Sequence, residues 1–127
     1  MRRTEQRRAA VVALYQAEVT DRPLEALVEP TARGFTRELV QGTHQARPEI
    51  DALIERFSEG WPLNRIAPLE RSILRVALHE LLHRPDVPAE VAIDGAVEAA
   101  KELCGTDAPG FVNGVLGAVH RERVGAA

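Results

Sequence analysis

Residues 68–84 read PLERSILRVALHELLHR and predict the helix on which the fold depends. Pro68 suits the first turn of a helix, and Pro85 ends the segment because proline cannot continue a helix. Around the helical wheel, apolar side chains fill most directions, so this helix should be central. The remaining sector is polar and holds four residues, Ser72, Arg75, His79 and His83. Glu80 falls within the otherwise apolar part, where a buried carboxylate needs a partner.

The segments on both sides of this helix are also helical in pattern, with apolar residues at spacings of three and four and proline or glycine at the boundaries. Besides a short helix between Leu24 and Pro30, we expect helices at about 4–19, 35–46, 48–60, 88–104 and from residue 109 onward. No segment alternates apolar and polar residues as a strand does. The sequence therefore predicts an all-α fold, a compact bundle of six or seven helices in two small subbundles that form one domain over residues 1–127.

The composition fits one globular domain, with 127 residues of which 45% are hydrophobic. Cys104 is the only cysteine, so no internal disulfide can form. No apolar run approaches the roughly 18 residues needed to span a bilayer, and the first residues lack the apolar stretch of a secretory signal. We therefore expect a soluble protein of a reducing cytoplasm, without a membrane segment.

The net charge of −3 is unevenly distributed along the chain. Residues 1–8 hold one acid, Glu5, and four bases, Arg2, Arg3, Arg7 and Arg8, which gives +3 there and leaves −6 for the rest. Guanidinium groups bind phosphate bidentately and stack on unpaired bases, as single-stranded RNA requires. The four arginines therefore favour phosphate or base recognition, and an ordinary solvated chain end is the alternative.

Residues 79–83 read HELLH and match the HExxH pattern of zinc metalloproteases. On a helix, His79 and His83 would lie one turn apart and Glu80 could activate a bound water. The spacing also permits Glu102 as a third ligand. Because the histidines lie in the polar sector and no strand is expected to hold a substrate, we expect no metal site and two solvated or locally hydrogen-bonded histidines.

Glu80 has two interpretations from its position on the wheel. It forms an intramolecular salt bridge, or it contacts a docking partner. Apolar neighbours such as Val76 would serve self-association as readily as partner docking, so a monomer and a homodimer both remain open.

Four stretches of the chain match one known family in order and spacing. They read RRTEQRRAAVVALY at 2–15, ERSILRVALHELL at 70–82, VPAEVAIDGAVEAAK at 87–101 and FVNGVL at 111–116. The last two are highly specific together, and the four cover both ends and most of the C-terminal half. On these stretches the chain resembles the NusB family of transcription antitermination factors.

The resemblance implies an all-α fold of two three-helix subbundles, with no catalytic activity and no cofactor. It also implies binding to single-stranded boxA RNA of ribosomal RNA operons with NusE, a small-subunit ribosomal protein, in the antitermination complex of RNA polymerase. By motif, the RNA contacts would be Arg2, Arg3, Arg7 and Arg8. The residues facing NusE would be Tyr15 and Glu80. Arg75 and Asn113 lie in matched strings too, either as RNA contacts or as structural residues.

Three positions depart from the family pattern. His79 stands where tyrosine is usual, Gly95 where glutamate is frequent and Gly117 where aspartate is common. The alternatives in the same class are an RNA-binding domain related to those fused to ribosomal RNA methyltransferases, and a helical scaffold without an RNA role. The lack of a glycine-rich cofactor loop counts against methylation, and the zinc protease is the alternative from a different class.

Overall fold

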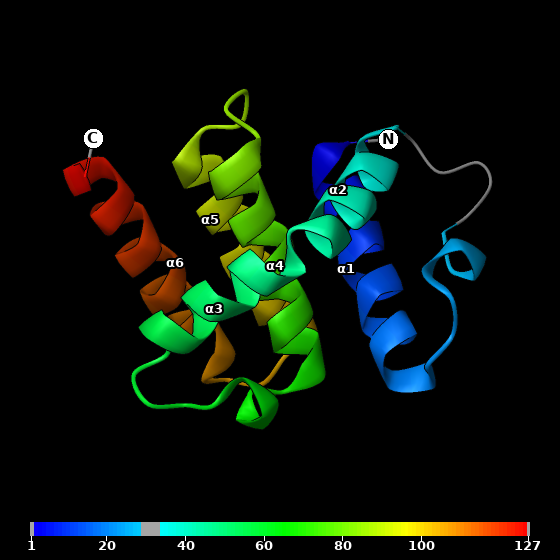
Figure 1. Cartoon of the computed structure of the whole chain (residues 1–127), viewed down its shortest axis with the longest axis horizontal. Helices are drawn as coiled ribbons and strands as arrows, with labels where there is room; N and C mark the ends of the chain where they lie inside the picture. The colour runs from blue at the N-terminus through cyan, green and yellow to red at the C-terminus, as the bar shows by residue number, and fades with distance from the viewer. Residues whose placement is uncertain (1, 29–33, 127) are drawn as a thin grey trace.

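The computed structural model of the protein describes residues 2–28 and 34–126. Six α-helices follow in chain order (Figure 1): α1 (Arg3–Thr20), α2 (Gly34–Gln45), α3 (Arg47–Phe57), α4 (Pro68–His83), α5 (Ala89–Leu103) and α6 (Ala108–Ala126). Two 3-10 turns, η1 (Leu24–Ala26) and η2 (Leu63–Arg65), lie in the connections. Within the described ranges there is no strand, which confirms the all-α fold. The break expected at Pro30 lies outside those ranges.

The helix boundaries follow the local signals in the sequence. Pro68 is the first residue of α4, and Pro88 directly precedes α5. Asp21 ends α1 in a left-handed conformation with φ of 55°, which aspartate tolerates better than most residues. The chain then turns back, so that α2 packs against α1.

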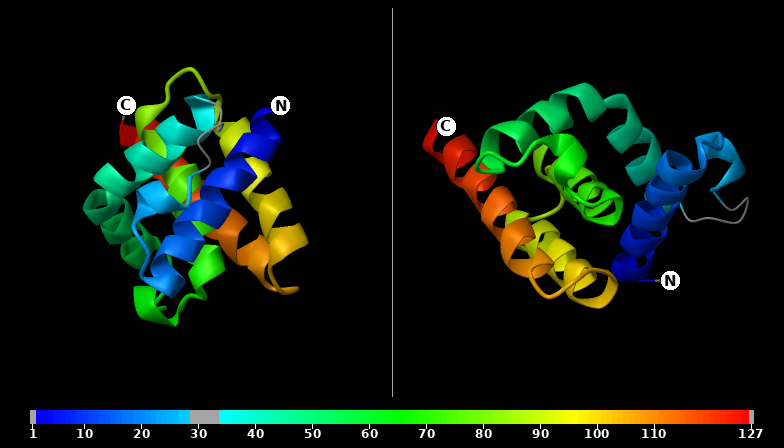
Figure 2. Two further views of the ribbon diagram at one scale, coloured as in Figure 1. Left: turned by 90° about the vertical axis from the view of Figure 1, so that its right-hand side faces the viewer. Right: turned by 90° about the horizontal axis from the view of Figure 1, so that it is seen from below.

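Helix α4 is the centre of the molecule and contacts all five other α-helices (Figure 1). Every residue from Ser72 to Glu80 is buried. Helices α4, α5 and α6 pack against one another, whereas α2 contacts both α1 and α3, which lie apart in Figure 1 and in the right-hand view of Figure 2. The two groups of three helices therefore join along the surface of α4.

The polar sector of α4 is mostly covered, so the expectation of solvated or locally hydrogen-bonded histidines is wrong for His79 and right for His83. Ser72, Arg75 and His79 are buried, and only His83 is exposed. The cause is the central place of α4, since α2 and α3 pack over the sector that the wheel left to solvent. Val76 is likewise 2% exposed, so its side chain is not available for self-association.

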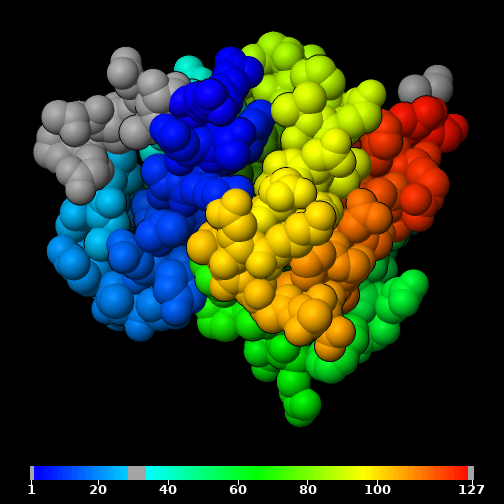
Figure 3. Space-filling model, turned by 180° about the vertical axis from the view of Figure 1, so that it is seen from behind, coloured from blue at the N-terminus to red at the C-terminus, as the bar shows by residue number. Residues whose placement is uncertain are grey.

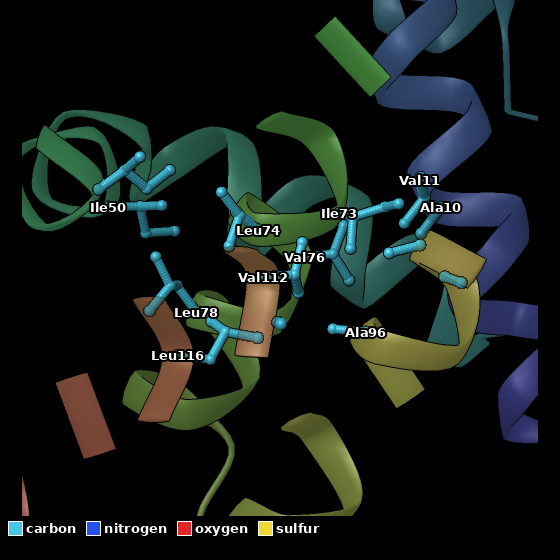
Figure 4. Packing of buried hydrophobic residues seen from close by; sticks show 14 of the residues in the cluster. Ala10, Val11, Ile50, Ile73, Leu74, Val76, Leu78, Ala96, Val112 and Leu116 are labelled. Carbon is cyan, nitrogen blue, oxygen red and sulfur yellow. The ribbon is translucent and has the colours of Figure 1, made fainter. Parts of the chain in front are cut away.

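The hydrophobic core draws side chains from every α-helix (Figure 4). Val11 of α1 and Ile73 of α4 line the same hollow, and Leu78 of α4 and Leu116 of α6 both belong to the core between these two packed helices. On α5 the buried residues are all alanines, Ala92, Ala96, Ala99 and Ala100. Their small side chains allow α5 to lie close to α4. This close packing holds in place the two helices that carry Glu80 and Glu102, whose ion pairs are described below. No helix in the described part of the chain combines the length and hydropathy needed to cross a membrane.

Candidate nucleic-acid interface

The four arginines predicted to bind RNA lie at the start of α1, but they differ in exposure. Arg2 is exposed just before the helix, and the Arg3 side chain is 50% exposed. Arg8 points toward α5, where it forms an ion pair with Glu102. Arg7 points inward and its side chain is only 12% exposed. The sequence pattern treated the four as equivalent, and the structure separates them.

Arg7 and Glu80 form an ion pair that joins α1 to α4. The Nε of Arg7 donates to Oε1 of Glu80 at 2.8 Å and to Oε2 at 3.0 Å. The Glu80 side chain is 1% exposed, and burial raises its pKa while the charge of Arg7 opposes that shift. Of the two interpretations of Glu80, the structure therefore shows the intramolecular salt bridge. A contact with NusE remains a prediction, and it would have to act through Arg7 or after a rearrangement.

A hollow of about 20 Å³ lies beside this ion pair, between α1, α4 and α5. It has room for one water molecule. Figure 3 shows the start of α1 lying beside α5 on this face. Gly95 of α5 lines the hollow, and a Cβ there would lie 3.7 Å from Cδ of Arg7, an ordinary contact. This departure from the family pattern therefore leaves space next to Arg7.

Phe35 of α2 gathers three guanidinium groups around one buried ring. The guanidinium carbon lies 4.3 Å from the ring centroid in Arg3, 5.5 Å in Arg7 and 5.1 Å in Arg84. Cations at these distances are attracted by the aromatic face. The sequence analysis singled out neither Phe35 nor Arg84. Nothing in the local pattern indicated the cluster, because its members come from three separate segments.

Tyr15 lies on α1 on the same face as Arg8, at a spacing of seven residues. Val12 and Val19 share this face, and they are 37% and 49% exposed. Exposed apolar residues in a continuous stripe are typical of surfaces that contact other proteins. The stripe from Arg8 to Val19 is therefore the candidate partner surface.

Arg75 is held in a buried network rather than on the surface. Its guanidinium donates to Glu18 of α1 and to Asp51 of α3, each at 2.8 Å. Arg71 also pairs with Glu18. Burial acts to raise the pKa of Glu18, but the two arginines outweigh it and hold that pKa below its ordinary value. For Arg75 the geometry favours the structural interpretation.

Asn113 is exposed on α6, which packs against α3, α4 and α5. On the same helix, a Cβ at Gly117 would lie 3.1 Å from a guanidinium nitrogen of Arg121. An aspartate side chain at position 117 would therefore lie directly beside the guanidinium of Arg121. With glycine at this position, the Arg121 guanidinium occupies part of the space that an aspartate side chain would take.

Within the HELLH segment, Glu80 and His83 pair with residues elsewhere in the fold, while the rings of His79 and His83 lie 5.7 Å apart. Glu80 binds Arg7, and Nε2 of His83 lies 2.8 Å from Glu49. The His79 ring is buried against Gly42 of α2, so closely that a Cβ at Gly42 would lie 2.2 Å from Cε1. Burial, followed by the charges of His83 and Arg84, lowers the pKa of His79.

Glu102, the third ligand that the spacing would allow, pairs with Arg8. Across the described residues, no three His, Cys, Asp or Glu side chains gather in a way that could hold a metal ion. Glu80 and His83 bind partners outside the segment and the His79 ring is buried against Gly42, so the geometry disfavours a zinc protease.

Comparison with known proteins decides the family, because residues 4–121 match the NusB family. The chain belongs to the NusB family. The match runs from α1 into α6 and includes Arg7 and Arg8, whereas Arg2 and Arg3 lie just before it.

Individual NusB relatives agree with this assignment. The transcription antitermination protein NusB of Rubrobacter xylanophilus is 42% identical over 122 residues, which cover 91% of this chain and 88% of that protein. NusB of T. maritima is 35% identical, with a TM-score of 0.87 over 96% of this chain and 92% of that chain. A chain from the structure of antitermination factors NusB and NusE in complex with dsRNA shares the fold at 24% identity, with a TM-score of 0.82 over 96% of this chain and 99% of that one.

Proposed function

We propose that this NusB-family chain is a transcription antitermination factor. It binds the boxA element of nascent ribosomal RNA transcripts together with NusE and helps RNA polymerase read through terminators. The observation that carries the proposal is the cluster of arginines at the start of α1, in a chain that matches the NusB family over residues 4–121. This function requires the protein in the cytoplasm, where transcription takes place.

The RNA surface in this proposal consists of the exposed arginines of α1. The side chains of Arg3 and Arg8 are 50% and 29% exposed, and their carboxylate partners are at least half exposed. Exposed ion pairs are worth about 1 kcal/mol or less, so phosphate groups of RNA can replace those carboxylates at small cost. Arg7 contributes mainly by fixing α1 against α4 through Glu80.

The NusE surface in this proposal is the stripe from Arg8 to Val19. Tyr15 lies in the middle of the stripe, between the exposed Val12 and Val19. Tyrosine is among the residues that most often carry binding energy at protein interfaces. Because Arg8 ends the stripe, one continuous surface of α1 would serve NusE and RNA together.

The protein acts in this proposal by binding and not by catalysis. Polar side chains that could do chemistry, such as Glu80 and His79, are buried in contacts within the bundle. The second candidate is a NusB-like RNA-binding or scaffold domain without an antitermination role. It shares the arginine cluster, so only a transcription assay separates the two.

The first experiment tests RNA and partner binding. The protein is co-purified with NusE of the same organism, and the complex is titrated against fluorescently labelled boxA RNA and a scrambled RNA of equal length. Arg8→Ala should weaken boxA binding and lower the slope of log affinity against log salt by about 0.7, the value for one phosphate of a single strand. The control is Arg56→Ala, an exposed arginine on α3, which should change little.

The second experiment tests the partner surface and the role in transcription. Tyr15→Ala should weaken NusE binding, whereas Val124→Ala on α6, 62% exposed, should not. In a reconstituted transcription reaction, the complex should increase read-through of a terminator that follows boxA. Equal affinity for boxA and scrambled RNA would overturn the specific RNA role, and binding without read-through would favour the second candidate.

A further inference from the structure

A carboxylate lies between two arginines beside the RNA surface. Arg84, just after α4, donates from Nε and from Nη2 to the two carboxylate oxygens of Asp86, each at 3.1 Å. On the other side, a guanidinium nitrogen of Arg3 lies 3.6 Å from Oδ2 of the same carboxylate. A single anion is thus held by the fork of one guanidinium and the charge of a second, an arrangement that also suits phosphate.

The guanidinium of Arg84 is fixed in place by groups other than Asp86. It lies 5.1 Å from the Phe35 ring centroid, and Nη1 donates to Glu38 of α2. Its side chain is 19% exposed. Arg3 also lies over Phe35, at 4.3 Å. The two cations are therefore held near one aromatic ring whether or not an anion lies between them, which lowers the entropy cost of binding one.

Asp86 is the most replaceable member of this group. Its side chain is 51% exposed, and it lies in the short connection between α4 and α5. The hydrogen bonds from Arg84 lower the pKa of Asp86, so the carboxylate is charged at neutral pH and competes with other anions for the guanidinium. An exposed ion pair of this kind contributes little to stability, so its carboxylate can be replaced by another anion.

We propose that Arg3 and Arg84 form a binding subsite for a backbone phosphate of the RNA, and that Asp86 occupies this subsite in the free protein as an internal competitor. The inference rests on the proposed RNA-binding function and adds Arg84 to its contacts. RNA displaces the Asp86 carboxylate, and one phosphate takes its place between the two guanidinium groups. Because the contact is to the backbone, it adds affinity without reading sequence.

Opposite effects of two substitutions test the subsite. Asp86→Asn removes the competing charge and should tighten RNA binding by about two- to fivefold, the range set by an exposed ion pair. Arg84→Ala should weaken binding by a similar factor and lower the salt slope by about 0.7. Arg84→Lys keeps the charge but loses the fork, so its affinity should fall between those of the natural protein and Arg84→Ala.

A general change in charge would also shift RNA affinity, so the controls match each substitution in charge. Glu122→Gln and Arg56→Ala break an exposed ion pair between α6 and α3, on the other side of α4 from α1 (Figure 1). The decisive measurement is the double variant of Arg84→Ala with Asp86→Asn. If Asp86 acts by occupying Arg84, most of the gain from Asp86→Asn disappears in the Arg84→Ala background.

Each outcome of the titration bears on the proposal. All variants are measured with NusE present, on boxA RNA and on scrambled RNA at low salt, with circular dichroism to confirm folding. The subsite would be overturned if Asp86→Asn tightened RNA binding as much in the Arg84→Ala background as in the natural protein. It would also be overturned if the affinity changes were no larger than those of the control variants. If the subsite is overturned but Arg8→Ala weakens RNA binding in the same series, the proposed RNA-binding function still stands. Failure of the natural protein to bind either RNA would remove both.

Discussion

Replacing Glu80 by alanine should destabilise the protein strongly, because it leaves the Arg7 guanidinium without its partner. The Arg7 side chain is 12% exposed and that of Glu80 is 1% exposed, so neither charge is well hydrated in the folded state. Breaking a buried pair by removing one member costs about 3–5 kcal/mol. We expect the lower end, about 3 kcal/mol, since the hollow beside the pair has a volume of about 20 Å³ and can admit one water.

The assay is urea unfolding followed by circular dichroism, with Glu98→Ala as the control. Glu98 is a glutamate on α5 that pairs with Lys101 at 57% exposure, and its removal should cost less than about 0.5 kcal/mol. Glu80→Gln keeps one oxygen that can accept from Arg7, so it should lose less than the alanine variant. A loss of about 3 kcal/mol is a large part of the 5–15 kcal/mol typical of a domain.

A double-mutant cycle decides whether the loss comes from the ion pair. Adding Arg7→Ala to Glu80→Ala removes the unpaired cation. The sum of the stability losses of the two single variants should therefore exceed the loss of the double variant by about 2 kcal/mol. Additive losses, or a cost below about 1 kcal/mol for Glu80→Ala, would refute the structural assignment. Glu80 would then be free to contact NusE directly, and Glu80→Gln would weaken NusE binding in a protein of unchanged stability.

Three further predictions concern the surroundings of α4. Gly42→Ala should cost about 1–3 kcal/mol in urea unfolding, because its Cβ would lie 2.2 Å from Cε1 of His79, and His79→Ala in the same chain should recover part of the loss. Glu18→Gln should destabilise the protein at pH 7 and progressively less toward pH 3. The pKa of Glu18 in the folded protein lies below its ordinary value. The stabilisation by Glu18 is therefore fully present above the ordinary pKa and disappears as the pH falls through the folded pKa. Equimolar zinc should leave the melting temperature unchanged, because His83 is bound to Glu49 and Glu80 to Arg7; stoichiometric zinc lost in His79→Ala would contradict this.

The helices were predictable because each carries its own boundary and periodic pattern. The expected start at Pro68 and the absence of alternating segments both agree with the structure. Apolar spacing is a local property, so it is visible without knowledge of the neighbours. The same pattern shows which residues face inward on a helix with one covered side. It fails on α4, which is covered on every side.

The partners of the polar residues were not predictable, because they lie far away along the chain. Arg75 is 57 residues from Glu18 and Glu80 is 73 residues from Arg7. The wheel identified Glu80 as a carboxylate that needs a partner, but could not say whether the partner is internal. It placed Arg75 with solvent-facing residues, because nothing local shows that Glu18 and Asp51 converge on it.

The charge of the arginine cluster also differs from what the sequence alone conveys. Residues 1–8 carry +3 as a segment, but in the fold Arg3 meets Asp86, Arg7 meets Glu80 and Arg8 meets Glu102. At these three positions, a phosphate of the proposed RNA ligand would have to replace a carboxylate already in place. Such exchange is inexpensive where the pair is exposed and costly where it is buried.

This difference divides the arginines by role. The pair of Arg7 and Glu80 is buried, so its disruption would cost more than one phosphate contact returns, and Arg7 serves chiefly to hold α1 on α4. The pairs of Arg3 and Arg8 are open to solvent and exchange readily. In the proposed RNA complex, these carboxylates would compete with weakly bound RNA, so an acidic protein could carry an RNA surface without binding RNA indiscriminately.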